Sequence, residues 1–323
     1  MRVKLWGVRG SLPTPLSPAH LRERIEWVIG EFERRKKSWQ TFKTADFVAD
    51  LPAHVSGGYG GNTACAEVTH AKSRLIIDAG SGIRAFSENV LTTSPQTSEF
   101  HIYFTHFHWD HVIGLPFFAP IYMKNKIVNC YAVHDNLEAA LRTIFRKPNF
   151  PVPYEVVENQ LRIHRLEPRQ PAKIGGFTLT PYQLDHPDPC WGARIEAGGK
   201  SLAWAVDTEC TRITHEELGE DAKLYTNSDL LVFDAQYSFD EALEKINWGH
   251  ASGPIGIDLA MRESVKRVIF MHHDPAASDD TIRAAEEQTR VYYDEILRAR
   301  KQAGLKTPEL DWHFAHEGET IQL

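Results

Sequence analysis

The chain has 323 residues, of which 42% are hydrophobic, 24% charged and 11% aromatic, and its formal net charge is −7 at pH 7. This composition, without an apolar run of the ~18 residues that span a bilayer, excludes disordered, low-complexity and membrane-spanning chains and predicts a cytoplasmic protein with no membrane partner. The acidic balance gives no overall attraction to polyanions, so contact with nucleic acid would need a local basic patch.

Short β-branched and aromatic runs alternate with longer amphipathic segments, and this pattern predicts an α/β fold. Helices are expected at 136–145, 253–263 and 280–303, and the last has a start signal at Ser278 and a stop signal at Gly304. Strands are expected, in chain order, at 3–6, 64–69, 74–78, 101–105, 127–132, 162–166, 177–184, 193–197, 201–206, 230–234 and 267–271.

Two features depart from this regular alternation. Residues 17–50 are charge-rich and lie between prolines, which predicts a helical insertion in a single domain covering 1–323. The sequence leaves open whether the insertion decorates the surface, covers a pocket as a lid, or forms a contact in a homodimer. Separately, two predicted hairpins each end close to an aspartate, Asp78 and Asp207, which suggests a duplicated β sandwich.

A histidine-rich motif follows the predicted strand at 101–105. Residues 105–111 have the sequence Thr-His-Phe-His-Trp-Asp-His and precede an apolar stretch, which places them in a strand-to-helix loop. His106 and His108 alternate and can point the same way, while Asp110 and His111 follow on the turn. Imidazole nitrogens and carboxylate oxygens are ligands that zinc and similar ions accept. The motif therefore predicts a metal site, for one or two ions.

The pattern His-x-His-x-Asp-His resembles the signature of the metallo-β-lactamase-fold hydrolases. Further similar segments follow the order of the family's phosphodiesterase branch, which includes RNase Z, at 1–13, 60–63, 75–82, 105–120, 184–209 and 249–275. The resemblance implies a four-layer αβ/βα sandwich. It also implies two divalent metal ions, with zinc as the first choice and manganese or iron as alternatives.

The same resemblance implies a role for individual residues. The metal ligands would be His106, His108, Asp110, His111, His186, Asp207 and His272. Asp207 is expected to bridge both ions and, with Asp110 and His250, to be catalytic. His272 is preferred to His273 because it directly follows the strand at 267–271, as the ligand does in the family.

Three further residues are assigned by resemblance without being ligands. His250, in the segment Gly-His-Ala-Ser, matches a histidine that handles a proton near the leaving group. Asp78 resembles an aspartate at a strand end that orients the histidine loop, and His273 is expected to support the ligands from behind.

The function implied by the resemblance is hydrolysis of a phosphodiester by a hydroxide held between two metal ions. RNase Z enzymes of the short bacterial type carry a long tRNA-gripping arm where this chain has only residues 187–206. The missing arm and the acidic charge favour a small or cyclic phosphodiester over folded RNA. The alternatives are a tRNA 3′-end endonuclease and a lactone or β-lactam hydrolase. A metal-free binding scaffold is a different class, and the intact ligand set argues against it.

Overall fold

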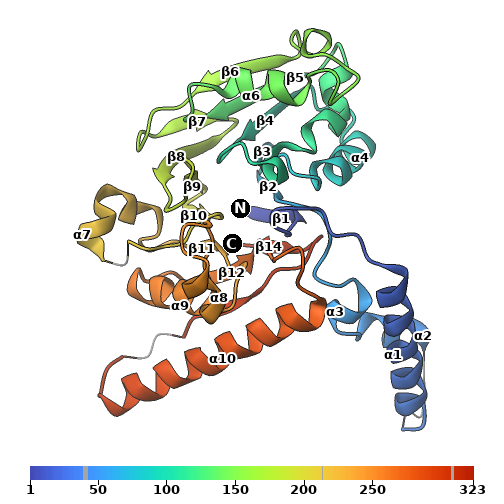
Figure 1. Cartoon of the computed structure of the whole chain (residues 1–323), viewed down its shortest axis with the longest axis vertical. Coiled ribbons are helices and arrows are strands. Elements are labelled where there is room, and N and C mark those ends of the chain that lie inside the picture. The colour runs from blue at the N-terminus through green and yellow to red at the C-terminus, as the bar shows by residue number, and fades with distance from the viewer. Residues whose placement is uncertain (39–42, 213, 307–308) are drawn as a thin grey trace.

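The computed structural model describes residues 1–38, 43–212, 214–306 and 309–323. Within these residues the strands form two seven-stranded sheets, with helices on their outer sides (Figure 1). The first sheet has the spatial order β14 (Thr320–Gln322), β1 (Arg2–Gly7), β2 (Cys65–His70), β3 (Ser73–Ile77), β4 (Glu99–Tyr103), β5 (Ile127–Ala132) and β6 (Leu161–Arg165). The second has the order β13 (Asp311–Phe314), β12 (Arg267–Met271), β11 (Leu230–Asp234), β10 (Lys200–Ala205), β9 (Trp191–Ala197), β8 (Phe177–Gln183) and β7 (Ala172–Ile174).

The two sheets are mixed and follow the same plan. In the first, an antiparallel β2–β3 hairpin is followed by parallel pairing of β3 with β4. In the second, an antiparallel β9–β10 hairpin is followed by parallel pairing of β10 with β11. Asp78 and Asp207 follow β3 and β10 at equivalent places. The repetition expected from the sequence is therefore present in the topology.

The hydrophobic core lies in three layers that separate four layers of structure. Along β12, Ile269 faces the first sheet, whereas Phe270 faces the helices on the outer side of the second sheet, because successive side chains of a strand point to opposite faces. Likewise, β3 directs Ile77 toward the second sheet and Ile76 toward the helices on the other side. The expected α/β fold with four layers is confirmed. The helices that cover the outer faces are α4 (Ile83–Thr93) and α6 (Leu137–Ile144) on the first sheet and α9 (Gly253–Arg262) and α10 (Asp279–Gln302) on the second.

The expected strands agree with the observed ones to within two residues at each end. The short edge strands β7, β13 and β14 were not predicted, because three or four residues show too little alternation to be recognised. Helix α4 was also missed. Its second half is Asn-Val-Leu-Thr-Thr, in which β-branched residues weaken the helical signal, and the helix is stabilised by packing Phe86 and Val90 into the core.

Residues 17–50 contain α1 (Pro18–Lys36) and α2 (Thr44–Ala49), while residues 39–42 lie outside the described residues. Ser17 caps α1 by accepting a hydrogen bond from the His20 amide. Together with α3 (Ala53–Ser56), these helices form an arm that stands out from the sandwich beside the start of α10 (Figure 1). An ion pair between Arg24 and Asp279 ties α1 to α10.

The remaining short α-helices of the described residues are α5 (Trp109–Val112), α7 (His215–Leu218) and α8 (Phe239–Glu244). Among the described residues, no helix combines the length and apolar character needed to cross a membrane.

Candidate metal centre

Polar side chains gather where the strands of both sheets end. Asp78 follows β3, Asp207 follows β10, Asp234 is the last residue of β11 and His272 follows β12. Strands that run parallel in one sheet present their carboxyl ends at the same edge, which is where ligands bind in α/β proteins. The fold therefore brings together residues that are far apart in the sequence.

Three of these strand-end residues have left-handed backbone conformations. The φ angles are 58° at Asp78, 64° at Asp207 and 69° at His272. Such angles cost a residue with a side chain about 1–3 kcal/mol and concentrate at functional sites. Here they turn the chain sharply at the end of each strand, so that the side chain stays at the sheet edge while the backbone leaves it.

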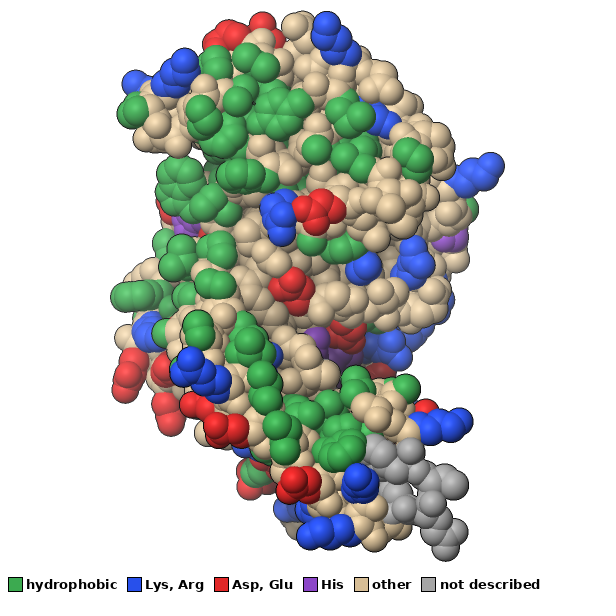
Figure 2. All heavy atoms as spheres, turned by 90° about the vertical axis from the view of Figure 1, so that its right-hand side faces the viewer, with side chains coloured by type: hydrophobic (Ala, Val, Ile, Leu, Met, Phe, Trp, Pro, Cys, Tyr) green, Lys and Arg blue, Asp and Glu red, His purple; other side chains and the backbone are tan. Residues whose placement is uncertain are grey.

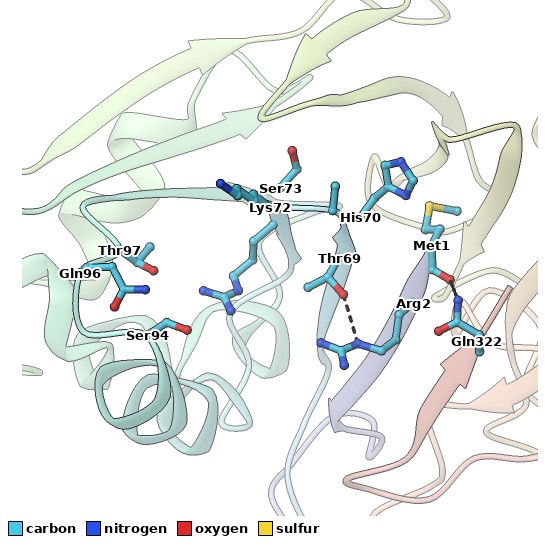
Figure 3. Close-up of a pocket in the computed structure, with 12 residues that line it drawn as sticks. Met1, Arg2, Thr69, His70, Lys72, Ser73, Ser94, Gln96, Thr97 and Gln322 are labelled. Atoms are coloured by element: carbon cyan, nitrogen blue, oxygen red, sulfur yellow. Dashed lines mark hydrogen bonds between the residues drawn. The ribbon is translucent and has the colours of Figure 1, made fainter.

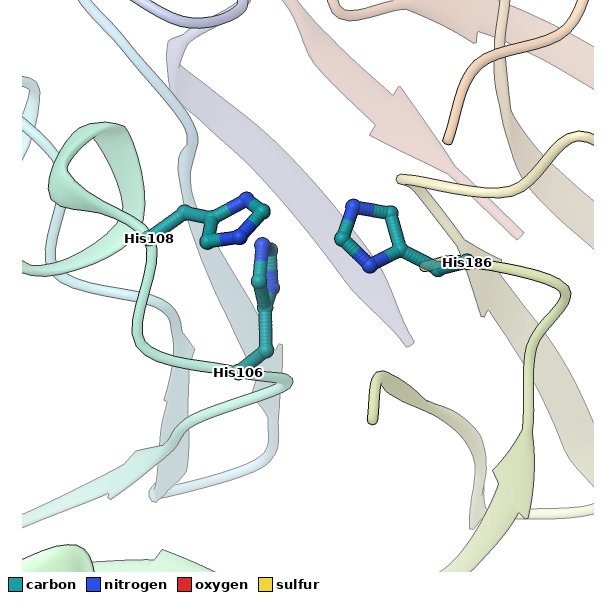
Figure 4. A group of neighbouring side chains, drawn as sticks. All are labelled: His106, His108 and His186. Carbon is teal, nitrogen blue, oxygen red and sulfur yellow. The ribbon is translucent and has the colours of Figure 1, made fainter. Parts of the chain in front are cut away.

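A first group consists of His106, His108 and His186, whose ligand atoms lie within 4.8 Å of one another. His106 and His108 come from the loop before α5 and His186 from the loop between β8 and β9, and the three rings face a common point (Figure 4). Nε2 of His106 is buried and has no hydrogen-bond partner in the described part of the chain. Burial lowers the pKa of His106 well below its usual value, so the ring is neutral, as a metal ligand must be.

Asp188 fixes the two more accessible rings of this group. Its carboxylate accepts a hydrogen bond from Nε2 of His108 at 2.9 Å, and its backbone carbonyl accepts one from Nδ1 of His186 at 2.8 Å. Each ring therefore keeps its other nitrogen available. Asp188 was not predicted from the sequence, although its position two residues after His186 could have indicated a contact with that ring.

A second group consists of Asp110, His111, Asp207 and His272, all buried, with ligand atoms within 4.8 Å of one another. Nε2 of His111 lies 2.9 Å from Oδ2 of Asp207 and 3.3 Å from Nε2 of His272. Burial would raise the pKa of Asp207, but His272 and His111 hold it well below its usual value, so the carboxylate is ionised. Asp207 belongs to this group and is outside the first, so its bridging role stays a prediction.

Both groups fit divalent metal ions. The donors are imidazole nitrogens and carboxylate oxygens, the set that zinc, manganese and iron accept. Nε2 of His106 and Oδ2 of Asp207 are buried without hydrogen-bond partners among the described residues. Buried polar atoms are normally satisfied, and a cation would satisfy these two. The structure brings all seven predicted ligands into these two groups.

Asp78 lies directly behind the ligands. Its Oδ2 accepts a hydrogen bond from Nδ1 of His111 at 2.9 Å, and its Oδ1 accepts one from the Thr105 amide at 2.9 Å. Oγ1 of Thr105 is 3.1 Å from Nδ1 of His106. One carboxylate therefore fixes a ring in each group, His111 directly and His106 through Thr105.

His250 lies beside the second group, with its ring stacked on His272 at 5.0 Å between centroids. Its Nδ1 donates to Oδ2 of Asp234 at 3.0 Å and is 3.7 Å from Oδ1 of Asp207. Burial would lower the pKa of His250, but Asp234 and Asp207 outweigh this effect and raise it to about 9. The ring is therefore protonated at neutral pH. Asp234 was missed from the sequence, although it ends a predicted strand as Asp78 does.

His273 points away from the metal groups. Its Nε2 donates to the Ala315 carbonyl at 2.9 Å, its ring stacks on Phe314, and burial lowers its pKa to about 3. The structure thus places His272, and not His273, among the candidate ligands. His273 was expected to support the metal ligands from behind. Its side chain instead has Ala315, Phe314 and Tyr59 as hydrogen-bond and ring partners.

The segment after β1 also reaches the site. The Ser11 amide donates to Oδ2 of Asp110 at 2.8 Å. A Cβ on Gly10 would lie 2.5 Å from Nδ1 of His272, so only glycine fits there. Neither residue was predicted as part of the site.

A separate cavity of about 720 Å³ lies at the opposite end of the first sheet (Figure 3). It is lined by Ser73 at the start of β3, whereas Asp78 and the metal groups lie beyond the end of that strand. None of the candidate ligands lines this cavity.

Comparison with known proteins finds one matching family model and similarity to ribonuclease Z sequences. The model of the beta-lactamase superfamily domain matches residues 73–273. Ribonuclease Z of Staphylococcus carnosus is 28% identical over 172 residues, which cover 51% of this chain and 52% of that protein. Ribonuclease Z of Archaeoglobus fulgidus is 22% identical over 283 residues, which cover 73% of this chain and 89% of that protein. The match thus spans about half the length of the first relative and most of the second.

Solved structures share the fold along the whole chain. Unliganded yeast PDE1 has a TM-score of 0.61 at 13% identity, with 100% of this chain and 99% of that chain covered. A diphosphatase of the PhnP family has a TM-score of 0.58 at 16% identity, with 100% and 97% covered. The short form of human tRNase Z has a TM-score of 0.57 at 15% identity, with 100% and 99% covered. At these identities the likeness establishes the fold alone.

Proposed function

Because this chain belongs to the beta-lactamase superfamily, whose domain model matches residues 73–273, we propose that it is a metal-dependent hydrolase that cleaves a small or cyclic phosphodiester. The observation that carries the proposal is the pair of adjacent groups of metal-binding side chains at the strand ends. The same fold is found in a PhnP-family diphosphatase and in yeast PDE1, so the fold is compatible with the proposal.

The residues that would hold two divalent ions, zinc in first place, divide between the two groups. His106, His108 and His186 would hold one ion, Asp110, His111 and His272 would hold the other, and Asp207 would be shared. Two such ions supply positive charge for the phosphoryl oxygens and make water a stronger nucleophile at neutral pH. Phosphodiesters are anionic and resist attack, so both effects are needed.

The protein's own hydrogen bonds would keep the ligand nitrogens correctly oriented. Asp78 holds Nδ1 of His111, so Nε2 of that ring faces the second group. Asp188 holds His108 and His186 in the same way. Because such outer partners fix the tautomer and the direction of a ring, they contribute strongly to metal affinity.

His250 would handle the proton of the leaving group. Asp234 engages its Nδ1, which leaves Nε2 to donate a proton to the departing oxygen. The raised pKa of His250, about 9, keeps that proton in place at neutral pH. Since Asp234 is buried and accepts the Ala251 amide as well, it orients the ring without itself reaching the substrate.

A tRNA 3′-end endonuclease is the second candidate, and the similarity to ribonuclease Z proteins favours it. Between His186 and Asp207, however, the chain forms only the β9–β10 hairpin, which turns at Gly198 and Gly199. The tRNA-gripping arm expected there for RNase Z enzymes of the short bacterial type has no counterpart. This difference supports a small substrate.

The test is a substrate panel with metal-free and metal-loaded protein. We expect bis(p-nitrophenyl) phosphate and a cyclic nucleotide to be hydrolysed by protein loaded with Zn²⁺ or Mn²⁺, and chelation to abolish this activity. Precursor tRNA and a lactone test the two alternatives. Turnover of the lactone without cleavage of any phosphodiester would overturn the proposal.

A further inference from the structure

Four segments contain candidate ligands, or residues that contact them, and together these segments contain no lysine or arginine. They are residues 11–16, 106–123, 186–192 and 246–252, called the mouth segments here. None of the 36 lysine and arginine residues of the chain falls within them. The first joins the site through the Ser11 amide, and the last through Gly249, where an added Cβ would lie 2.2 Å from the His186 ring.

The mouth segments expose large hydrophobic side chains. These are Leu12, Leu16, Trp109, Phe117, Tyr122, Ile246 and Trp248. Figure 2 shows hydrophobic side chains gathered in a band down one edge of the molecule. Contiguous apolar surface on a folded protein marks a binding site more often than chance exposure does.

Two tryptophans occupy special positions in these segments. Trp109 directly follows His108, and Trp248 directly precedes Gly249, which touches His186. The ring centroids of His108 and His186 are 4.9 Å apart, so both rings lie at the same end of the metal centre. Trp109 is next to His108 in the chain, and Trp248 is next to the glycine that contacts His186. Trp109 is 58% exposed and Trp248 is 63% exposed. Among the described residues, neither indole has a ring contact or a hydrogen bond.

On the basis of the proposed phosphodiesterase function, we propose that the mouth segments bind the planar base of a nucleotide-type phosphodiester, with Trp109 and Trp248 as the stacking residues. Aromatic faces bind bases by stacking, which needs no positive charge. A polynucleotide would instead require lysine and arginine along its phosphates, and the mouth segments have none. A cyclic sugar phosphate without a base would leave both indoles unused.

The test uses two substrates that share a leaving group, one with a nucleoside on the phosphate and one with only a methyl group. They are thymidine 5′-(p-nitrophenyl phosphate) and methyl p-nitrophenyl phosphate. The wild-type protein should prefer the thymidine ester. Trp109→Ala and Trp248→Ala should each raise its KM by about 10-fold to 100-fold, because stacking on one aromatic side chain is lost. The loss in kcat/KM for the methyl ester should be several-fold smaller, and Trp109→Phe and Trp248→Phe should restore most of the preference.

Trp27→Ala is the matched control, because Trp27 is also an exposed tryptophan but lies on α1, outside the mouth segments. It should change neither substrate's kinetics. Equal losses on both esters in the tryptophan variants, or equal kcat/KM for both esters in the wild type, would overturn the inference and leave phosphodiesterase activity standing. Higher kcat/KM for precursor tRNA than for the thymidine ester would also overturn it. If neither ester is cleaved, the proposed function fails and the inference fails with it.

Discussion

His111 and Asp78 are joined by a hydrogen bond of 2.9 Å between Nδ1 and Oδ2, and both side chains are completely buried. The bond settles which nitrogen of His111 faces the other candidate ligands. Because Asp78 also accepts the Thr105 amide, the strand-end aspartate fixes the backbone and the ring of the histidine loop at the same time. The loop therefore presents its donors in a preformed arrangement.

Replacing Asp78 by Asn should weaken metal binding while keeping the side-chain shape. Loss of an outer partner of this kind lowers metal affinity by about 10-fold to 100-fold. Zinc affinity measured by competition with a chromogenic chelator checks the effect. Asp188→Asn is the comparison on the exposed side of the centre, where water can replace the lost contact, and its effect should be smaller. Equal zinc affinity for Asp78→Asn and wild type would contradict the role given to Asp78.

His250→Ala and His272→Ala separate proton transfer from metal binding. His250→Ala should retain near-normal metal content and lower kcat by about 10²-fold to 10⁴-fold on a substrate with a poor leaving group. The effect should shrink with p-nitrophenyl esters, whose leaving group needs little protonation. His272→Ala should lose metal and activity on every substrate. Metal content by mass spectrometry decides the case, and loss of metal in His250→Ala would make His250 a ligand.

Asp234 and His250 should behave as one unit. Asp234→Asn removes the carboxylate that holds Nδ1 of His250, so kcat should fall while KM changes little. If Asp234 acts through His250, the double variant should be no slower than His250→Ala alone, since coupled residues are not additive. Multiplied effects in the double variant would show that Asp234 acts independently.

Gly249 is predicted to accept no other residue. Its φ is 89°, and a Cβ there would lie 2.2 Å from Cδ2 of His186. Gly249→Ala should therefore displace His186 and reduce both metal content and activity. Gly199→Ala is the matched control, because Gly199 also has a positive φ, 72°, but has open space around it. The control should lose some thermal stability and keep its metal. A greater loss of metal in Gly199→Ala than in Gly249→Ala would contradict the close fit at His186.

The sequence was informative where a residue's role depends on spacing. The alternation of His106 and His108 after a strand predicted a metal site from the residues alone. His186 and His272 were assigned by family resemblance, since nothing local to them distinguishes them from other histidines. The strand cores were predicted because alternating apolar residues carry a strong signal, as at 230–234 and 267–271.

The features that sequence reasoning missed depend on tertiary contacts. Asp234 ends a strand like any other polar residue until the fold places His250 beside it. The Ser11 amide has no side-chain signal at all, because a backbone group binds Asp110. The exposure of Trp109 and Trp248 likewise becomes visible only in the structure, since the same residues would normally be expected in a core.

The most direct test of the central claim is a metal titration of the chelated protein, with hydrolysis of bis(p-nitrophenyl) phosphate as the readout. We predict no hydrolysis by the metal-free protein and a rise on addition of Zn²⁺ or Mn²⁺ that reaches its limit at two ions per chain. Asp207→Ala should remain inactive at every metal concentration, because the carboxylate that we propose to be shared by both ions is gone. Full hydrolysis by the metal-free protein, or no hydrolysis at any metal concentration, would contradict the assignment of a metal-dependent phosphodiesterase.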